Sequence, residues 1–106
     1  MTYKVKWTKK ALDDYKEIII FLQEKWGMAS AEKFQEIVDR KLQIISTFPK
    51  ISSIVGYLIN IRKAVIVKQV SLYYMELEKE REVQVIRLLD NRQNPESIQE
   101  LLSEYE

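Results

Sequence analysis

Two apolar stripes at helical spacing, with a glycine in the short segment between them, constrain the first half of this 106-residue chain. Apolar residues recur every three or four positions through residues 11–26 and again through residues 31–48. This spacing predicts one helix over about residues 9–26 and a second that ends at Pro49. Gly27 suits the position that follows a helix, whereas proline cannot continue one. Because the turn between the stripes is short, the two helices are expected to pack antiparallel as a hairpin.

The second half of the chain changes to the alternating pattern of β-strands. Residues 59–68 are rich in β-branched side chains and residues 69–78 follow as a second strand. The polar tetrad at 79–82 is typical of a hairpin turn into a third strand at 83–89, so we expect an antiparallel meander. Residues 3–7 also alternate, which predicts a further strand ahead of the helices. One face of the strand at 83–89 is expected to hold Val83, Val85, Arg87 and Leu89.

Turn-forming residues mark the remaining segments. Residues 49–57 are expected to form a loop and residues 90–95 a turn, with Pro95 at the start of a last short helix that carries Ile98, Leu101 and Leu102. The order strand, helix, helix, strand, strand, strand, helix predicts a single α+β domain over residues 1–106. In this prediction an antiparallel four-stranded sheet carries the N-terminal helical hairpin on one face, and the other face stays partly open.

Histidine and cysteine are both absent from the sequence. Their absence excludes disulfide frameworks, thiolate zinc sites, cysteine nucleophiles and serine–histidine–aspartate arrangements. We therefore expect no metal and no cofactor, and any catalysis must use Lys, Arg, Tyr or carboxylates. The apolar runs fall far short of the ~18 residues of a membrane span. The N-terminus lacks the apolar region of a signal peptide, so a cytoplasmic protein without a membrane partner is expected.

The net charge of +1 hides a segregation of charge along the chain. Residues 1–63 carry 12 basic and 7 acidic side chains, whereas residues 64–106 carry 5 basic and 9 acidic side chains. Basic side chains gather near the N-terminus and again around Arg62, Lys63 and Lys68. Such groups can face phosphates, and they can equally solvate a strand edge or a helix start.

The reactive side chains that remain are basic or phenolic and fall on the predicted meander. Arginine forms bidentate, charge-assisted hydrogen bonds with phosphate oxygens. A lysine or tyrosine of lowered pKa can take a proton from a ribose 2′-hydroxyl. The candidate catalytic residues of a histidine-free ribonuclease are therefore Arg62, Lys63, Arg87 and Arg92, with Tyr73 and Tyr74 on the neighbouring strand.

Each candidate also has a structural interpretation. Side chains alternate along a strand, so Arg62 and Lys63 must point to opposite faces of the sheet. Arg87 can pair internally with an acidic residue such as Glu76, and Arg92 can tie down its own turn through a nearby aspartate. On residue chemistry alone, contact with phosphate and a purely structural role both stay open.

Short motifs recur in order over almost the whole chain. They are Val5-Lys6-Trp7-Thr8, Phe21-Leu22, Trp26-Gly27, Phe48-Pro49, Ile61-Arg62-Lys63, Leu72-Tyr73-Tyr74 and the strand that ends in Asp90-Asn91-Arg92-Gln93-Asn94-Pro95. Together they resemble the RelE/ParE superfamily of bacterial toxins. The resemblance implies a β-α-α-β-β-β-α toxin of a type II toxin–antitoxin system, linked to plasmid stabilisation. It also implies a cognate antitoxin whose C-terminal segment wraps around the toxin.

Members of this superfamily divide by target. The resemblance implies either a ParE-like toxin that blocks DNA gyrase or a RelE-like toxin that cuts messenger RNA on the ribosome without a metal. For RelE-like cleavage, Arg62 or Lys63 matches the basic residues of the second strand, and Arg92 matches the arginine at the end of the fourth. Ser71 stands where the catalytic set has another arginine, and Ile98 falls near the place of its tyrosine.

Three hypotheses therefore stand for function. The incomplete catalytic set favours a ParE-like toxin that acts by binding gyrase. The basic cluster on the meander is the case for a ribosome-dependent endoribonuclease, in which another residue such as Lys68 replaces the missing arginine. The third hypothesis is a degenerate member that binds its antitoxin without being toxic.

Overall fold

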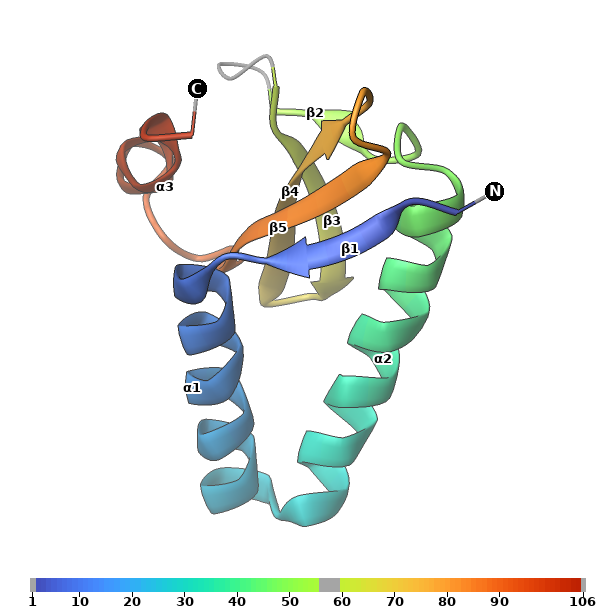
Figure 1. The fold of residues 1–106 in the computed structure, drawn as a ribbon. Coiled ribbons are helices and arrows are strands. Elements are labelled where there is room, and N and C mark those ends of the chain that lie inside the picture. The colour runs from blue at the N-terminus through green and yellow to red at the C-terminus, as the bar shows by residue number, and fades with distance from the viewer. Residues whose placement is uncertain (1, 56–59, 106) are drawn as a thin grey trace.

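The computed structural model describes residues 2–55 and 60–105 as an α+β fold. In Figure 1, α1 and α2 meet at their far ends and spread apart toward the sheet, while α3 lies beside β5 at a distance from α2. The elements in chain order are β1 (Lys4–Trp7), α1 (Lys9–Trp26), α2 (Met28–Thr47), β2 (Ser53–Ile54), β3 (Arg62–Val67), β4 (Val70–Leu77), β5 (Glu82–Asp90) and α3 (Pro95–Ser103).

The helical hairpin forms where the two apolar stripes predict it. Thr8 caps α1, since its side-chain oxygen accepts a hydrogen bond from the backbone N–H of Ala11 at 3.1 Å. Gly27 caps the C-terminal end of α1, its φ of +94° lies in the region that favours glycine, and its N–H donates to the Gln23 carbonyl. α2 begins at the next residue, so the predicted antiparallel hairpin is confirmed.

The sheet has five strands in the order β1-β5-β4-β3-β2. β3, β4 and β5 pair antiparallel in sequence order, which confirms the predicted meander. The predicted four-stranded antiparallel sheet is wrong in two details, because β1 runs parallel to β5 and β2 adds a fifth strand at the other edge. The alternation of residues 3–7 identifies a strand but says nothing about its partner or direction. A strand separated from its partner by a long crossover can pair in parallel.

β2 lies inside the segment predicted to be a loop. It contains only Ser53 and Ile54, both exposed, which pair with two residues of β3. Two residues are too few to produce an alternating pattern, so this strand carries no signal in the sequence. The predicted loop positions 56–57 and the predicted strand start at Ile59 lie outside the described residues.

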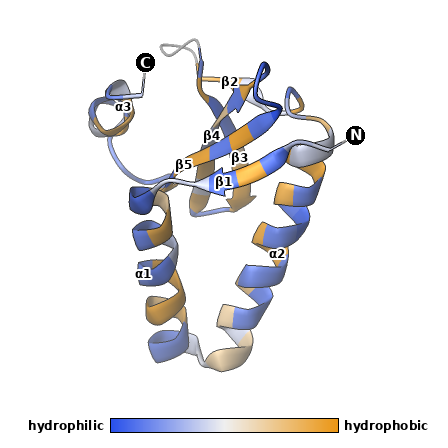
Figure 2. Ribbon diagram, viewed as in Figure 1, coloured by the Kyte–Doolittle hydropathy of each residue, from blue (hydrophilic) through white to orange (hydrophobic). Residues whose placement is uncertain are grey.

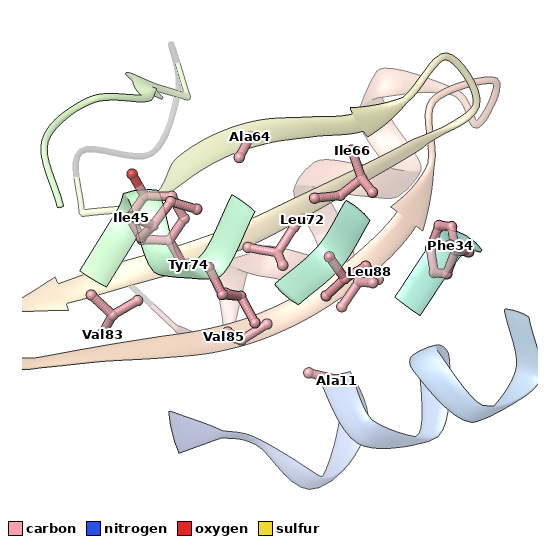
Figure 3. Close-up of a cluster of buried hydrophobic side chains, with 12 residues drawn as sticks. Ala11, Phe34, Ile45, Ala64, Ile66, Leu72, Tyr74, Val83, Val85 and Leu88 are labelled. Carbon is pink, nitrogen blue, oxygen red and sulfur yellow. The ribbon is translucent and has the colours of Figure 1, made fainter. Parts of the chain in front are cut away.

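The main hydrophobic core lies between the helical hairpin and the sheet. In Figure 2 each hairpin helix carries a hydrophobic side and a hydrophilic side. Phe34 and Ile45 are buried on the inner side of α2, and Ala11 is buried on α1. Alternate strand residues point into the same core, as the two-residue period of a strand requires. Figure 3 shows them as Ala64, Ile66, Leu72, Tyr74, Val83, Val85 and Leu88.

A second, smaller core lies on the other face of the sheet, beneath α3. The predicted short helix is confirmed, with Pro95 in its first turn and the Asn94 side chain accepting the Glu96 N–H as its N-cap. α3 therefore covers part of the face that the sequence predicts to be open. Its contacts bury Ile98 and Leu102 of α3 with Ile61, Tyr73, Ile86 and Leu89.

A register shift in β5 separates residues that are predicted to share a face. The shift falls opposite Tyr73 and Tyr74 and leaves Ile86 as an extra residue on β5. Val85 consequently points into the main core, whereas Leu89 points into the second core. A two-residue period does not reveal an inserted residue. The predicted common face is therefore wrong for the set Val83, Val85, Arg87 and Leu89.

Candidate functional site

An apolar groove opens between α1 and the far end of the meander. It has a volume of about 520 Å³. α1 supplies one wall, the β3–β4 turn and the end of β5 supply the other, and α2 contributes one aromatic side chain. The lining residues are Asp14, Glu17, Ile18, Phe21, Leu22, Trp26, Phe34, Val67, Gln69, Val70, Leu88, Asp90 and Arg92.

The groove exposes large aromatic side chains to solvent. Phe21 is 56% exposed and Trp26 is 68% exposed, although both continue the apolar side of α1. Figure 1 shows that this part of the hairpin projects past the sheet. An exposed apolar surface of this kind is typical of an interaction site.

A bidentate ion pair fixes α1 to β5 beside the groove. Nε of Arg87 donates to Oδ2 of Asp14 at 2.7 Å, and a terminal guanidinium nitrogen donates to Oδ1 at 3.0 Å. Oδ2 also accepts the Leu88 backbone N–H at 3.0 Å. The two charged side chains are only 13% and 14% exposed, and the hydrogen bond to Asp14 raises the pKa of Arg87. Arg87 thus pairs with α1, whereas Glu76 accepts a hydrogen bond from the Tyr3 hydroxyl.

Arg92 is held by Asp90 at the edge of the groove. Its Nε and a terminal nitrogen donate to the Asp90 carboxylate at 3.0 and 2.7 Å, and its backbone N–H donates at 2.8 Å. These hydrogen bonds lower the pKa of the Asp90 carboxyl to about 2. The predicted tie between Arg92 and its own turn is confirmed, although the Arg92 side chain stays 77% exposed.

Arg62 supports the loop that follows α2. One terminal nitrogen donates to the carbonyl oxygens of Ser52 at 2.7 Å and Lys50 at 3.3 Å. At the facing position of β4, the Tyr74 hydroxyl donates to the Pro49 carbonyl at 2.7 Å. Two side chains from adjacent strands therefore hold this loop in place.

Lys63 lies in a second hollow, away from the groove. β2, β3, β4 and the segment that leads into α3 line this hollow of about 520 Å³, and Tyr73 is among its lining residues. The Lys63 side chain is exposed there. Arg92 lines the groove instead, Arg87 bonds to α1, and Arg62 bonds to a loop. The four predicted catalytic residues are thus distributed over different parts of the molecule.

Ser71 and Ile98, the two positions where the resemblance predicts an incomplete catalytic set, are both buried. The Ser71 hydroxyl donates to the side-chain oxygen of Asn91. Asn91 in turn donates to the Lys68 carbonyl at 3.0 Å, which joins the β3–β4 turn to the end of β5. Ile98 belongs to the second core. Both residues therefore have packing roles in this fold.

Within residues 2–55 and 60–105, no group of three or more His, Cys, Asp or Glu residues is placed to hold a metal ion. No helix in these same segments combines the length and hydropathy needed to cross a membrane.

One protein family matches most of the chain. Its model, described as the ParE toxin of the type II toxin–antitoxin system parDE, matches residues 5–95. The chain belongs to the ParE toxin family. This match runs from β1 into the start of α3 and confirms the resemblance to RelE/ParE toxins. No curated protein matches the chain.

Solved structures share the fold of this ParE-family chain. The chromosomal ParDE system of P. aeruginosa aligns with a TM-score of 0.65 and 19% identity, over 84% of this chain and 96% of that one. The RelBE2 toxin–antitoxin complex of Mycobacterium tuberculosis aligns at 0.64 and 15%, over 86% and 100%. A variant of the E. coli toxin RelE in the free state aligns at 0.65 and 19%, over 98% and 94%. At these identities the likeness shows the fold.

The sequence of this ParE-family chain contains a signal for the groove that the helical pattern hides. Trp26 follows Leu22 by four positions and therefore reads as part of the core stripe, and Phe21 lies directly before Leu22 beside that stripe. In the structure α1 extends past the sheet, and the end of its stripe stays exposed (Figure 1). An apolar stripe that is longer than the sheet it covers is the signal that could have revealed this site.

Replacing Asp14 is expected to destabilise the ParE-family fold. Asp14→Ala should lower the free energy of unfolding by about 2 kcal/mol, because the guanidinium of Arg87 and the N–H of Leu88 lose their acceptor. The control is Asp13→Ala, which removes an exposed pair with Lys9 and should change stability by less than about 0.5 kcal/mol. Urea denaturation measures both variants, and equal losses would contradict the anchoring role of Asp14.

The carboxyl of Asp90 is expected to titrate near pH 2 rather than near its ordinary pKa of 3.8, because Arg92 stabilises the ionised form. A pKa that is lower in the folded state contributes stability above the unfolded-state pKa, and this contribution disappears as the pH falls through the folded-state value. The contribution of Asp90 to stability is therefore lost as the pH falls from about 4 to about 2. NMR titration of the carboxyl carbon should show the Asp90 pKa rising toward 3.8 in Arg92→Gln and unchanged in Lys9→Gln. An Asp90 pKa that stays unchanged in Arg92→Gln would refute this assignment.

Proposed function

We propose that this chain is the toxin of a type II toxin–antitoxin pair, that it arrests growth by binding DNA gyrase, and that a cognate antitoxin neutralises it. One observation carries the binding mechanism: the arginines that could serve catalysis are engaged within the chain. Arg87 is paired with Asp14, Arg92 with Asp90, and Arg62 with backbone carbonyls of the loop after α2.

RNA cleavage by a RelE-like mechanism requires several charged groups aimed at one reacting phosphate. Removing one such preorganised donor from an active site costs about 3 kcal/mol of transition-state stabilisation. Ser71, at the place of one arginine, is buried and bonded to Asn91, and Ile98 is packed beneath α3. Lys63 is exposed, and it lies in a different hollow from Arg92. This arrangement favours binding over cleavage.

A toxin that is neutralised by another protein needs an accessible surface to which that protein can bind, and the groove is such a surface. Phe21 and Trp26 are large, exposed and adjacent to further apolar lining, and aromatic anchors of this kind carry much of the energy of protein interfaces. Proteins of the same fold include a ParDE system and a RelBE2 toxin–antitoxin complex. We therefore propose that the antitoxin occupies the groove and covers these two side chains.

The purified protein is expected to inhibit DNA supercoiling by gyrase and to leave ribosome-bound messenger RNA intact, because it binds rather than cleaves. Topoisomer gels and primer extension measure the two activities. In cells, induction should stop DNA synthesis before protein synthesis, as separate labelling of the two would show.

Two outcomes would favour the other hypotheses. Messenger RNA cleavage that is lost in Arg92→Ala would support a ribosome-dependent endoribonuclease. Normal growth on induction, combined with tight binding of the antitoxin, would support a degenerate member of the family.

Phe21→Asp is expected to weaken antitoxin binding by at least about 30-fold, because loss of an interface hot spot costs about 2 kcal/mol or more. The matched control is Ile20→Asp. Ile20 is the adjacent residue and is 53% exposed, close to the 56% of Phe21, but it does not line the groove. Titration calorimetry with the small protein encoded beside the toxin gene measures both affinities. A similar loss in the two variants would show that the antitoxin does not use the groove.

A further inference from the structure

Three carboxylates line the groove, and they differ in what they bind. Asp14 accepts hydrogen bonds from Arg87, and Asp90 accepts hydrogen bonds from Arg92. Glu17 lines the same groove from α1 with an exposed side chain. Its carboxylate forms no hydrogen bond or ion pair with any residue in segments 2–55 and 60–105. The Glu17 carboxylate is therefore available to pair with a cation of a binding partner.

Glu17 lies one helical turn before Phe21 on the groove side of α1. A partner that covers Phe21 and Trp26 also removes water from the Glu17 carboxylate. A carboxylate that loses water without gaining a cation is unfavourable, whereas a cation from the partner compensates for the lost hydration. The lining carries three carboxylates against the guanidinium of Arg92, so the groove stays acidic even when Arg87 is counted. Its charge thus favours a basic occupant.

The backbone of the strand wall favours a helix as that occupant. β1 pairs with β5 only as far as Val85. Beyond that point the Thr8 hydroxyl donates to the Ile86 carbonyl at 3.0 Å, and Asp14 accepts the Leu88 N–H. An added strand would have to displace both of these hydrogen bonds. A helix satisfies its own backbone groups and needs only side-chain contacts from the groove.

We propose that the groove selects an amphipathic helix that carries a lysine or arginine beside its apolar side, and that Glu17 determines this preference for positive charge. This inference rests on the proposed antitoxin site. Glu17 is then a specificity-determining residue. It distinguishes a basic helix from an acidic helix that presents the same apolar side chains.

A displayed peptide library tests this selection directly. The library keeps one apolar helix side constant and varies the flanking positions among Lys, Glu, Gln and Ala. It is selected against the wild type, Glu17→Lys and Glu24→Lys. Glu24 is the matched control, because it is exposed on the same helix and does not line the groove.

The wild type and Glu24→Lys are expected to enrich lysine, and Glu17→Lys is expected to enrich glutamate. Two synthetic peptides that differ only in Lys against Glu at the enriched position should differ about tenfold in affinity for the wild type at low salt. This ratio should fall at high salt, since salt screens exposed charges, and it should reverse for Glu17→Lys.

Phe21→Asp separates the two ways in which this proposal can fail. Peptides that bind the wild type, fail to bind Phe21→Asp and show no charge preference would overturn charge selection by Glu17 and leave the groove as a docking site. A lysine preference that persists in Glu17→Lys would likewise overturn the role of Glu17. A library that yields no binders, or peptides that bind Phe21→Asp as tightly as the wild type, would overturn this inference together with the proposed antitoxin site.

Discussion

The Asp14 carboxylate joins the helical hairpin to the sheet at the point where β5 loses a neighbouring strand. β1 ends opposite Val85, yet β5 continues to Asp90. An unpaired buried backbone group costs about as much as a lost hydrogen bond. The exposed edge is satisfied by α1 itself, because the N-cap residue Thr8 bonds the Ile86 carbonyl and Asp14 bonds the Leu88 N–H. The start of α1 thus replaces β1 beside β5, which sets the hairpin at an angle to the sheet and leaves the groove between them.

Local signals in the sequence predict the helices and the meander, and they miss features that depend on distant pairing. Gly27 and Pro49 mark helix ends through their own backbone chemistry, so the predicted span of α1 agrees with the structure and the predicted end of α2 lies within two residues of the observed end. The parallel direction of β1 depends on β5, which lies more than seventy positions away in the chain. The extra residue Ile86 in β5 is likewise visible only against β4. A period of two residues describes one strand and not its partner.

The same contrast between near and distant partners explains what could be predicted of the site. Arg92 and Asp90 are two positions apart, and their pairing is foreseen from the turn. Arg87 and Asp14 are 73 positions apart, so residue type alone makes Arg87 look available for phosphate when it is held by α1. A basic residue on a predicted strand is therefore weak evidence for catalysis until its acidic neighbours are placed. The groove is not evident from the sequence because Trp26, which lines it, has the spacing of a core residue.

The exposed end of α1 gives the fold a surface with two separable properties. Phe21 and Trp26 are 56% and 68% exposed, and covering them is favourable because it removes their apolar area from water. That gain is nearly independent of which apolar groups cover them, so it supplies affinity without discrimination. Glu17 contributes in the opposite way. A cation from the partner adds little net affinity, because it only compensates for the hydration that the carboxylate loses, whereas an anion or a neutral group leaves that loss uncompensated and weakens binding. An apolar groove with one unpaired acid therefore binds through its aromatic side chains and discriminates through its charge.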